Sequence, residues 1–396
     1  MSYVNGKFKS LLLGMIWVTT TQSICDSAEN PKRAIDPACV VNLCVGPSHK
    51  LRKPSEAALI AKNGQTILIE AAEYHGDIAY WPQDNLTIRG VNGRAHLVAD
   101  GASFGGKGAW VISGSDSIVE NIEFSGAKVP DQNGAGIRFE GKNITIRNCY
   151  FHNNENGILS GANKDGQILI ENSEFANNGF GDGQSHNIYI GRTQRLTAKF
   201  NSFHHAKVGH NLKSRARENY ITYNRFIDEL DGTASYEINL PDGGLAFLIG
   251  NIIQQGPKTE NETIVSYGEE GLQKGPHEFY FANNTVINDG PPDGKFIHIA
   301  KGVARVLVVN NLFSGQGKIL DGIGELKNNM QVGKSHFVAP DEFNYQLNEK
   351  SNAIGAGIDP GKVRDINLLP SFQYVHPLRS APRKTNQRLD LGALSR

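Results

Sequence analysis

Large apolar residues recur at a nearly constant interval along most of this chain. Each of these anchors follows an asparagine by two or three positions, and consecutive anchors lie 23 to 33 residues apart. The pairs are Asn121 with Phe124, Asn148 with Phe151, Asn172 with Phe175, Asn201 with Phe203, Asn224 with Phe226, Asn251 with Ile253, Asn284 with Val286 and Asn311 with Phe313. A period of this length is typical of proteins in which each repeat stacks on its neighbours.

Short stretches of alternating apolar and polar residues accompany the anchors, as expected for strands. One set is formed by residues 143–147, 166–170 and 305–309, and a second by residues 136–139, 157–160, 186–190 and 210–213. Two or three strands in about 25 residues cannot pair as hairpins and still keep this period, so we predict a solenoid of parallel strands. An up-and-down barrel is the structural alternative, but it requires tight hairpin turns and a shorter spacing.

The composition agrees with a fold of many short strands and turns. The 396 residues include 44 glycines and are 39% hydrophobic, which excludes helical bundles and coiled coils. Basic and acidic residues balance, with 40 of each. A chain without net charge lacks the usual electrostatic basis for binding nucleic acid or an anionic membrane, so we expect neither partner.

The N-terminus has the layout of a secretory signal. Lys7 and Lys9 precede an apolar run at residues 11–18, and the residues after this run are small and polar. The apolar run is too short to span a bilayer, so we expect no membrane span. We therefore predict a signal peptide at residues 1–28 and a soluble protein that is secreted or periplasmic.

Further features define the predicted organisation of the chain. Cys39 and Cys44 are close enough to form a small disulfide loop in an oxidising compartment, whereas Cys149 lies in an apolar repeat and is predicted to be a buried thiol. Residues 54–61 combine Ser55 as an N-cap with apolar helical spacing, which predicts a short helix that caps the first coil. The predicted parts are an N-terminal extension at 29–53, the solenoid at 54–330 and an irregular C-terminal flap at 331–396 that packs on the solenoid.

The repeat, together with segments 86–91, 351–357 and 390–393, resembles the right-handed parallel β-helix proteins. The resemblance covers nearly all of the chain after the predicted signal, and it implies an all-β, single-stranded right-handed parallel β-helix. Pectate and alginate lyases, polygalacturonases, uronate epimerases and phage-type binding proteins share this scaffold. The resemblance therefore does not imply one particular activity.

Aligning neighbouring coils on the second set of strands predicts one row of inward side chains, with outward rows on either side because strands alternate with a period of two. The inward row is Ile137, Ile158, Ile188, Leu212, Ile238 and Ile297. The outward row one residue later is Arg138, Leu159, Tyr189, Lys213, Asn239 and His298, and the row one residue earlier includes Asn187, Asn211 and Glu237. His186 and His210 repeat just before this earlier row. Basic, aromatic and amide side chains on one face predict a groove for an acidic sugar chain.

Cleavage of a uronic acid chain by elimination requires a group that neutralises the carboxylate, a base for the C5 proton and an acid for the leaving oxygen. Arg215 and Arg217 lie close to Lys213 in the chain, and their like charge favours its neutral form, which predicts Lys213 as the base. Tyr189 and His210 are the predicted residues for the second proton. The predicted substrate-binding residues are His186, Asn187, Arg192, Asn211, Arg215, Glu237 and Asn239.

Lys213 and Ser214 form a Lys-Ser pair, which is followed by residues 219–221 and 224–226. This stretch is similar to the Lys-Ser…Asn-x-Ile…Asn-x-Phe stretch of the chondroitinase B and alginate lyase family of β-helix lyases. In that family the lysine is the base, a role that the resemblance carries over to the lysine of this pair. Ala206 and Val208 stand where the family has acidic calcium ligands. We therefore expect no metal or cofactor, although the resemblance leaves calcium binding as an alternative.

These features together predict an exported polysaccharide lyase, an enzyme that cleaves an acidic, uronate-containing polysaccharide by β-elimination and acts as a monomer. A uronate C5-epimerase on the same scaffold is one alternative, because it needs the same neutraliser and base. A non-catalytic carbohydrate-binding or envelope β-helix protein is another. A hydrolase of the polygalacturonase type is disfavoured, because Asp228, Asp231 and Asp242 are separated along the predicted groove.

Overall fold

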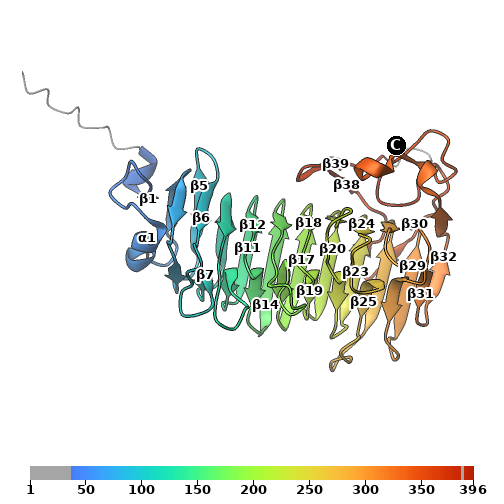
Figure 1. Cartoon of the computed structure of the whole chain (residues 1–396), viewed down its shortest axis with the longest axis horizontal. Helices are drawn as coiled ribbons and strands as arrows, with labels where there is room; N and C mark the ends of the chain where they lie inside the picture. The colour runs from blue at the N-terminus through green and yellow to red at the C-terminus, as the bar shows by residue number, and fades with distance from the viewer. Residues whose placement is uncertain (1–36, 385–387) are drawn as a thin grey trace, which may run out of the picture. The chain divides into compact units, whose positions relative to one another are not determined.

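The computed structural model describes residues 37–384 and 388–396, and its strands form three long parallel sheets (Figure 1). The described residues from 41 onwards belong to one compact unit. Strands of the three sheets alternate along the chain, so each coil contributes one strand to each sheet. The predicted right-handed parallel β-solenoid is confirmed. The predicted signal peptide at residues 1–28 lies outside the described residues.

The three sheets are named here by their number of strands. The 12-stranded sheet contains β1 (Leu43–Val45), β2 (Thr66–Glu70), β5 (Thr87–Val91), β8 (Ser117–Glu120), β11 (Asn143–Arg147), β14 (Asn163–Glu171), β17 (Thr193–Lys199), β20 (Glu218–Thr222), β23 (Leu245–Ile249), β26 (Glu278–Ala282), β29 (Arg305–Val309) and β32 (Glu325–Lys327). The 11-stranded sheet contains β3 (Glu73–His75), β6 (Ala95–Val98), β9 (Ile122–Ser125), β12 (Tyr150–His152), β15 (Glu174–Ala176), β18 (Ser202–His204), β21 (Arg225–Ile227), β24 (Ile252–Gln255), β27 (Thr285–Asn288), β30 (Leu312–Ser314) and β33 (Met330–Val332). The 10-stranded sheet contains β4 (Ala79–Trp81), β7 (Gly108–Ile112), β10 (Ala135–Phe139), β13 (Asn156–Ser160), β16 (Ile188–Ile190), β19 (His210–Ser214), β22 (Tyr236–Leu240), β25 (Thr263–Tyr267), β28 (Lys295–Ile299) and β31 (Lys318–Asp321).

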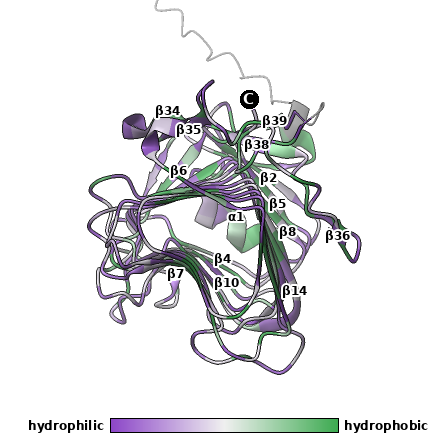
Figure 2. Cartoon of the chain, turned by 90° about the vertical axis from the view of Figure 1, so that its right-hand side faces the viewer, coloured by the Kyte–Doolittle hydropathy of each residue, from purple (hydrophilic) through white to green (hydrophobic). Residues whose placement is uncertain are grey.

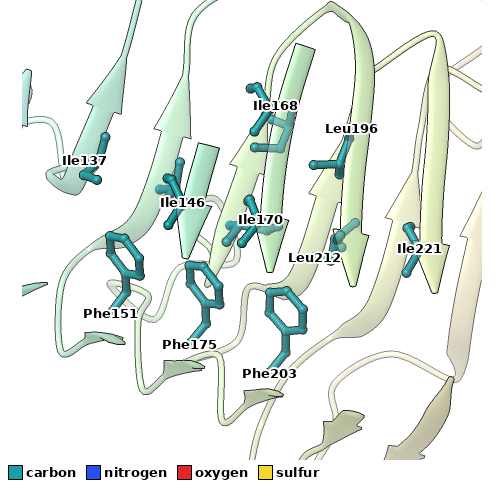
Figure 3. Close-up of a cluster of buried hydrophobic side chains, with 14 of the residues drawn as sticks. Ile137, Ile146, Phe151, Ile168, Ile170, Phe175, Leu196, Phe203, Leu212 and Ile221 are labelled. Carbon is teal, nitrogen blue, oxygen red and sulfur yellow. The ribbon is translucent and has the colours of Figure 1, made fainter. Parts of the chain in front are cut away.

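The interior between the three sheets is filled by side chains that repeat from coil to coil (Figure 3). The anchors Phe124, Phe151, Phe175, Phe203 and Phe226 pair in register across neighbouring strands and have no exposed surface. Their ring centroids lie 4.7 to 4.9 Å apart, with adjacent rings nearly parallel. The predicted inward stack is confirmed. Because each ring packs on the next coil, one large apolar residue per repeat stabilises the whole stack.

The asparagines before the anchors occupy two different positions, although the sequence pattern treated them as one set. In later coils they form an internal ladder, in which Asn224 Nδ2 donates to Asn251 Oδ1 at 3.0 Å. In earlier coils, Asn121, Asn148 and Asn172 instead form the bend between two sheets, with φ of 57°, 48° and 51°. Asparagine tolerates this left-handed backbone better than most residues. The two positions are one residue apart, which accounts for spacings of two and three residues before the anchor.

The N-terminal end of the solenoid begins earlier than predicted. β1 lies within the predicted extension, yet it pairs in parallel with β2 and extends the 12-stranded sheet. Helix α1 (Pro54–Ile60) forms in the region predicted to be helical and buries one side against the core. The N-cap of this helix is Lys53 and not the predicted Ser55. The backbone N–H of Ser55 donates a hydrogen bond to Asp77 Oδ2 at 3.1 Å. Over the described ranges, no helix has the length and apolar character of a membrane span.

The cysteines have the states that their spacing predicted. Cys39 and Cys44 are each disulfide-bonded. Cys149 is a free thiol without exposed surface, and burial raises its pKa to about 12. This thiol therefore stays protonated and packs as a small apolar side chain.

The chain after β33 folds back over two of the three sheets. It forms antiparallel hairpins rather than the predicted irregular flap, with β34 (Phe337–Ala339) paired to β35 (Asn344–Leu347), β36 (Lys362–Val363) to β37 (Ile366–Asn367), and β38 (Phe372–Val375) to β39 (Arg379–Pro382), and with short 3-10 helices at Lys334–His336 and Pro340–Glu342. Tyr345 joins Leu312 of the 11-stranded sheet in one apolar cluster, and Leu368 joins Phe247 of the 12-stranded sheet in another. In Figure 2, β34, β35, β38 and β39 lie on the side of the molecule that carries β6, and β36 lies on the side that carries β14. The outer face of the 10-stranded sheet contributes to neither of these two clusters and carries the polar row described next.

Candidate functional site

The register of the 10-stranded sheet agrees with most of the predicted ladder. The buried residues that pair with one another from strand to strand are Ile137, Ile158, Ile188, Leu212 and Ile238. One coil was missed, because Val265 of β25 lies between Ile238 and Ile297. The outward row therefore contains Ser266 after Asn239, and His298 lies two coils from Asn239 instead of beside it.

Tyr189 of β16 lies beside two cations from the next coil. Lys213 Nζ is 5.3 Å from the centre of the tyrosine ring, and Arg215 Nε donates a hydrogen bond to the hydroxyl at 2.8 Å. The two basic side chains are 13% and 15% exposed, so solvent reaches both. An amine, a guanidinium and a phenol at this spacing can supply a base, an anion clamp and a proton donor.

Two carboxylates complete this cluster. Asp242 accepts hydrogen bonds from Arg215 and, at 2.7 Å, from Arg192 Nε. Glu270 forms ion pairs with both Arg215 and Lys213, with its Oε1 3.0 Å from Lys213 Nζ. Desolvation disfavours the charge of Arg215, but its hydrogen bond to Glu270 and the charge of Asp242 outweigh this effect and raise its pKa. Arg215 is therefore a fixed cation at the centre of the site.

The surroundings of Lys213 differ from the predicted ones in one respect. The sequence predicted that Arg215 and Arg217 disfavour its ammonium form by like charge. In the structure, Glu270 also supplies a carboxylate at ion-pair distance from Lys213, a contact that the sequence argument did not include.

Glu270 belongs to the loop between β25 and β26, here called the covering loop (residues 268–277), which lies over the row of outward side chains. Its neighbour Glu269 accepts hydrogen bonds from the Tyr236 hydroxyl at 2.8 Å and from Ser266 Oγ at 2.9 Å. Asn239, in the predicted groove, is only 2% exposed. The covering loop therefore closes the side of the site that faces the C-terminal coils.

A pocket of about 430 Å³ opens where the 10-stranded sheet meets the 12-stranded sheet. Its lining includes the cations Lys164, Arg192, Arg215, Arg217, Lys274 and Arg364, and the carboxylates Glu218 and Asp242. Positive charges outnumber negative ones in this wall, although the whole chain is neutral. Such a pocket attracts an anionic ligand, and Arg215 connects it to Lys213 and Tyr189.

Several predicted site residues are buried and do not reach the groove. His186, Asn187, His210, Asn211, Glu237 and Asn239 are between 0% and 6% exposed. Asn187 and Asn211 lie where the backbone turns into the sheet, so the alternation of a regular strand does not apply to them. Asn187 Nδ2 donates to Asn211 Oδ1 at 2.5 Å, and Asn211 Nδ2 donates to Glu237 Oε2 at 2.7 Å. Asn187, Asn211 and Glu237 therefore form an internal polar ladder instead of a substrate-binding row.

The two buried histidines are neutral. His186 Nδ1 accepts a hydrogen bond from the His210 backbone N–H at 3.0 Å, and the two rings lie 4.4 Å apart. Burial lowers the pKa of His186 well below 6.5 and that of His210 to about 3. Burial has the opposite effect on Glu237, whose pKa is raised well above 4.5 with a further contribution from Asp228. His210 is therefore unsuited to the predicted role of acid, and Tyr189 is left as the candidate.

Sequence reasoning missed Glu270 because the coil of Val265 was left out of the ladder. Counting that coil places residues 269–270 directly after β25, next to the row of Lys213. In the sequence, Asp242 was considered only together with Asp228 and Asp231, as one of three aspartates that are separated along the predicted groove. The Gly243 and Gly244 that follow it, with φ of 74° and 101°, mark a turn at the corner of the coil, where Asp242 meets Arg215.

Groups with the composition of metal sites lie away from this cluster. Asp242 and Glu270 each pair with Arg215, so their charges are already compensated. Within the described part of residues 41–396, candidate metal ligands converge at His96, Glu123 and His152, and at His205, Glu229 and Asp231.

Comparison with known proteins agrees with the class that the fold defines, the right-handed parallel β-helix proteins. A family model described as "Right handed beta helix region" matches residues 76–229. A search of curated proteins gives no significant match.

Solved structures of the same fold include enzymes that act on polysaccharides. The pectate lyase Pel9A is similar with a TM-score of 0.61 and 13% identity, over 90% of this chain and 96% of that chain. An alginate lyase from Paenibacillus sp. str. FPU-7 has a TM-score of 0.38 and 15% identity, over 69% of this chain and 94% of that one. The pectin methylesterase PemA from Erwinia chrysanthemi has a TM-score of 0.40 and 10% identity, over 66% of this chain and 92% of that one. At 13% identity, the similarity to Pel9A establishes the fold alone.

Proposed function

We propose that this protein binds an acidic, uronate-containing polysaccharide and cleaves it by β-elimination. The observation that carries the proposal is the position of the Glu270 carboxylate, which contacts both Lys213 and Arg215 beside a pocket lined by further cations. A uronate carboxylate needs a fixed cation such as Arg215, and Glu270 occupies that cation from a partly exposed loop.

In the proposed complex, a uronate carboxylate replaces Glu270 on Arg215 and is also held by Arg192. With Glu270 displaced, the Lys213 amine is free to face C5, and in its neutral form it acts as the base. The neutral amine takes the C5 proton. The electrons of the C5–H bond form the double bond between C4 and C5, and the C4–O bond breaks. Tyr189 donates its proton to the leaving oxygen.

Incubation with a panel of uronate polysaccharides tests the proposal. Lyase activity releases one unsaturated end per cleavage, which is followed by ultraviolet absorbance and by chain shortening. Proton NMR in D₂O on the same samples detects the C5-epimerase alternative, because epimerisation exchanges the C5 proton without cleavage. Polysaccharide binding without either reaction would support the non-catalytic alternative and reject the proposal.

We further propose that the protein is exported and acts as a monomer. The basis for export is the basic and apolar pattern of residues 1–28, together with the disulfide-bonded Cys39 and Cys44. Cell fractionation with N-terminal sequencing of the mature protein tests export. Light scattering on the purified protein tests the oligomeric state. An uncleaved cytoplasmic product would reject export, and a stable dimer would reject the monomer.

A further inference from the structure

A second cluster of chemically active side chains lies on a different sheet from Lys213. His96 of β6, Glu123 of β9 and His152 of β12 come from three adjacent strands of the 11-stranded sheet (β6 and β12 in Figure 1). His96 pairs directly with Glu123 in the register, and His152 pairs with Ser125, two residues further along β9. The stacking of coils thus brings two imidazoles to either side of one carboxylate.

The donor atoms of this cluster converge on one point. His152 Nε2 lies 2.9 Å and His96 Nε2 lies 3.4 Å from the same atom, Glu123 Oε1. A tetrahedral zinc ion has ligand bonds of about 2.0–2.2 Å, which places neighbouring ligand atoms about 3.3–3.5 Å apart. The present separations need only small side-chain rotations to reach these values. The three side chains are 16% to 22% exposed, so an ion can enter from solvent.

The groups behind the two histidine rings favour Nε2 as the metal ligand of both His96 and His152. Glu73 Oε1 lies 3.8 Å from His96 Nδ1, on the far side of the ring from Glu123. The Asn153 amide lies 2.9 Å from His152 Nδ1 and can rotate to present its oxygen to an Nδ1 proton. A carboxylate or carbonyl behind the second ring nitrogen is the usual support for a metal-binding histidine. Ser125 Oγ, 2.8 Å from His96 Nε2, is a further oxygen on the same side.

We propose that His96, Glu123 and His152 bind one divalent transition-metal ion of the zinc class. Two imidazoles and a carboxylate suit zinc and its neighbours, whereas calcium and magnesium prefer oxygen ligands alone. The second described group, around His205, offers only one imidazole and is the weaker candidate. This metal site is independent of the proposed lyase activity.

Calorimetric titration of the untagged, EDTA-treated protein with Zn²⁺ tests the proposal, with the visible absorption of the Co²⁺ form as a second reading. We expect one ion per chain and much weaker binding of Ca²⁺ and Mg²⁺. Outer-shell partners typically contribute about 10- to 100-fold in affinity, so Glu73→Gln should weaken Zn²⁺ binding about 10-fold. His96→Ala and His152→Ala, which each remove a direct ligand, should weaken it by at least about 100-fold.

His298→Ala is the matched control, because His298 Nδ1 also faces a carboxylate, that of Asp321 at 3.0 Å, and lies on another sheet. This variant should bind Zn²⁺ like the parent protein. Circular dichroism of the metal-free variants shows whether each one is folded. The proposal is overturned if the folded parent protein takes up no Zn²⁺, or if His96→Ala and His152→Ala bind it as tightly as His298→Ala does.

Discussion

Glu270 Oε1 lies 3.0 Å from Lys213 Nζ, although the two residues are 57 positions apart in the chain. The contact exists because the covering loop follows β25, which lies two strands from β19 in the 10-stranded sheet. The carboxylate also pairs with Arg215. An anionic substrate therefore has to displace Glu270 before it can reach either cation.

Replacing Glu270 by glutamine should make the site easier to occupy. Partly exposed ion pairs contribute about 0–1 kcal/mol, so Glu270→Gln should lower KM for the uronate polymer by about two- to fivefold. Glu269→Gln is the control, because Glu269 bonds Tyr236 and Ser266 instead of Lys213. Steady-state kinetics with both variants provides the measurement. A higher KM for Glu270→Gln would mean that this carboxylate assists binding.

Lys213→Ala should remove most of the turnover. Loss of a general base typically costs about 10² to 10⁴ in rate, while the carboxylate clamp at Arg215 and Arg192 remains. We expect kcat to fall by this factor and the Kd for an oligouronate, measured by calorimetry, to change little. Lys199→Ala, which removes a surface lysine paired with Glu171 on another sheet, is the control. Full activity in Lys213→Ala would remove this lysine from the mechanism.

Phe175→Ala should destabilise the solenoid strongly. The Phe175 ring is fully buried and stacks at 4.9 Å on both Phe151 and Phe203. A cavity of this kind costs about 3–5 kcal/mol, which urea unfolding followed by circular dichroism would detect. Phe180→Ala, at a position that is 49% exposed, should change stability by less than about 0.5 kcal/mol. Equal stability of the two variants would contradict the inward stack.

The buried histidines should make the fold sensitive to acid. The pKa of His210 is about 3 in the folded chain and 6.5 in the absence of burial, so between these values the unfolded state binds more protons. Stability should therefore be fully present above pH 6.5 and fall as the pH decreases toward 3, with a contribution of about 1.4 kcal/mol per pH unit. Melting temperatures of the parent protein and of His210→Gln across this window measure the effect. An identical slope for the two proteins would show that His210 does not contribute.

The repeat-level features of the fold were predictable because each depends on the neighbouring coils alone. Phe175 needs only Phe151 and Phe203 to complete its packing, so the period of the sequence identifies all three as core residues. Features that depend on a single residue of register were not predictable in this way. Asn172 and Asn224 look alike in the sequence, yet one forms the bend and the other joins the internal ladder.

The site was predictable in part for the same reason. Tyr189 and Lys213 occupy equivalent positions in successive coils, and parallel strands in register place equivalent positions side by side. The position of Asn211 was not predicted, because the backbone turns where it enters the sheet. This turn directs the Asn211 amide toward Glu237 in the interior. The proposed metal-binding cluster was not predicted, because His96 and His152 lie two coils apart and at positions of the register that differ by two residues.

The sequence by itself therefore determined the parallel solenoid, its inward rows and the adjacency of Tyr189 to Lys213, since these follow from a repeat that stacks on its own copies. Only the tertiary structure decided which charges surround Lys213. Glu270 and Asp242 reach the site from the connections after β25 and β22, and such connections have no period. Their positions depend on contacts with side chains far away in the sequence, such as those of Arg215, and become defined only when the coils are stacked.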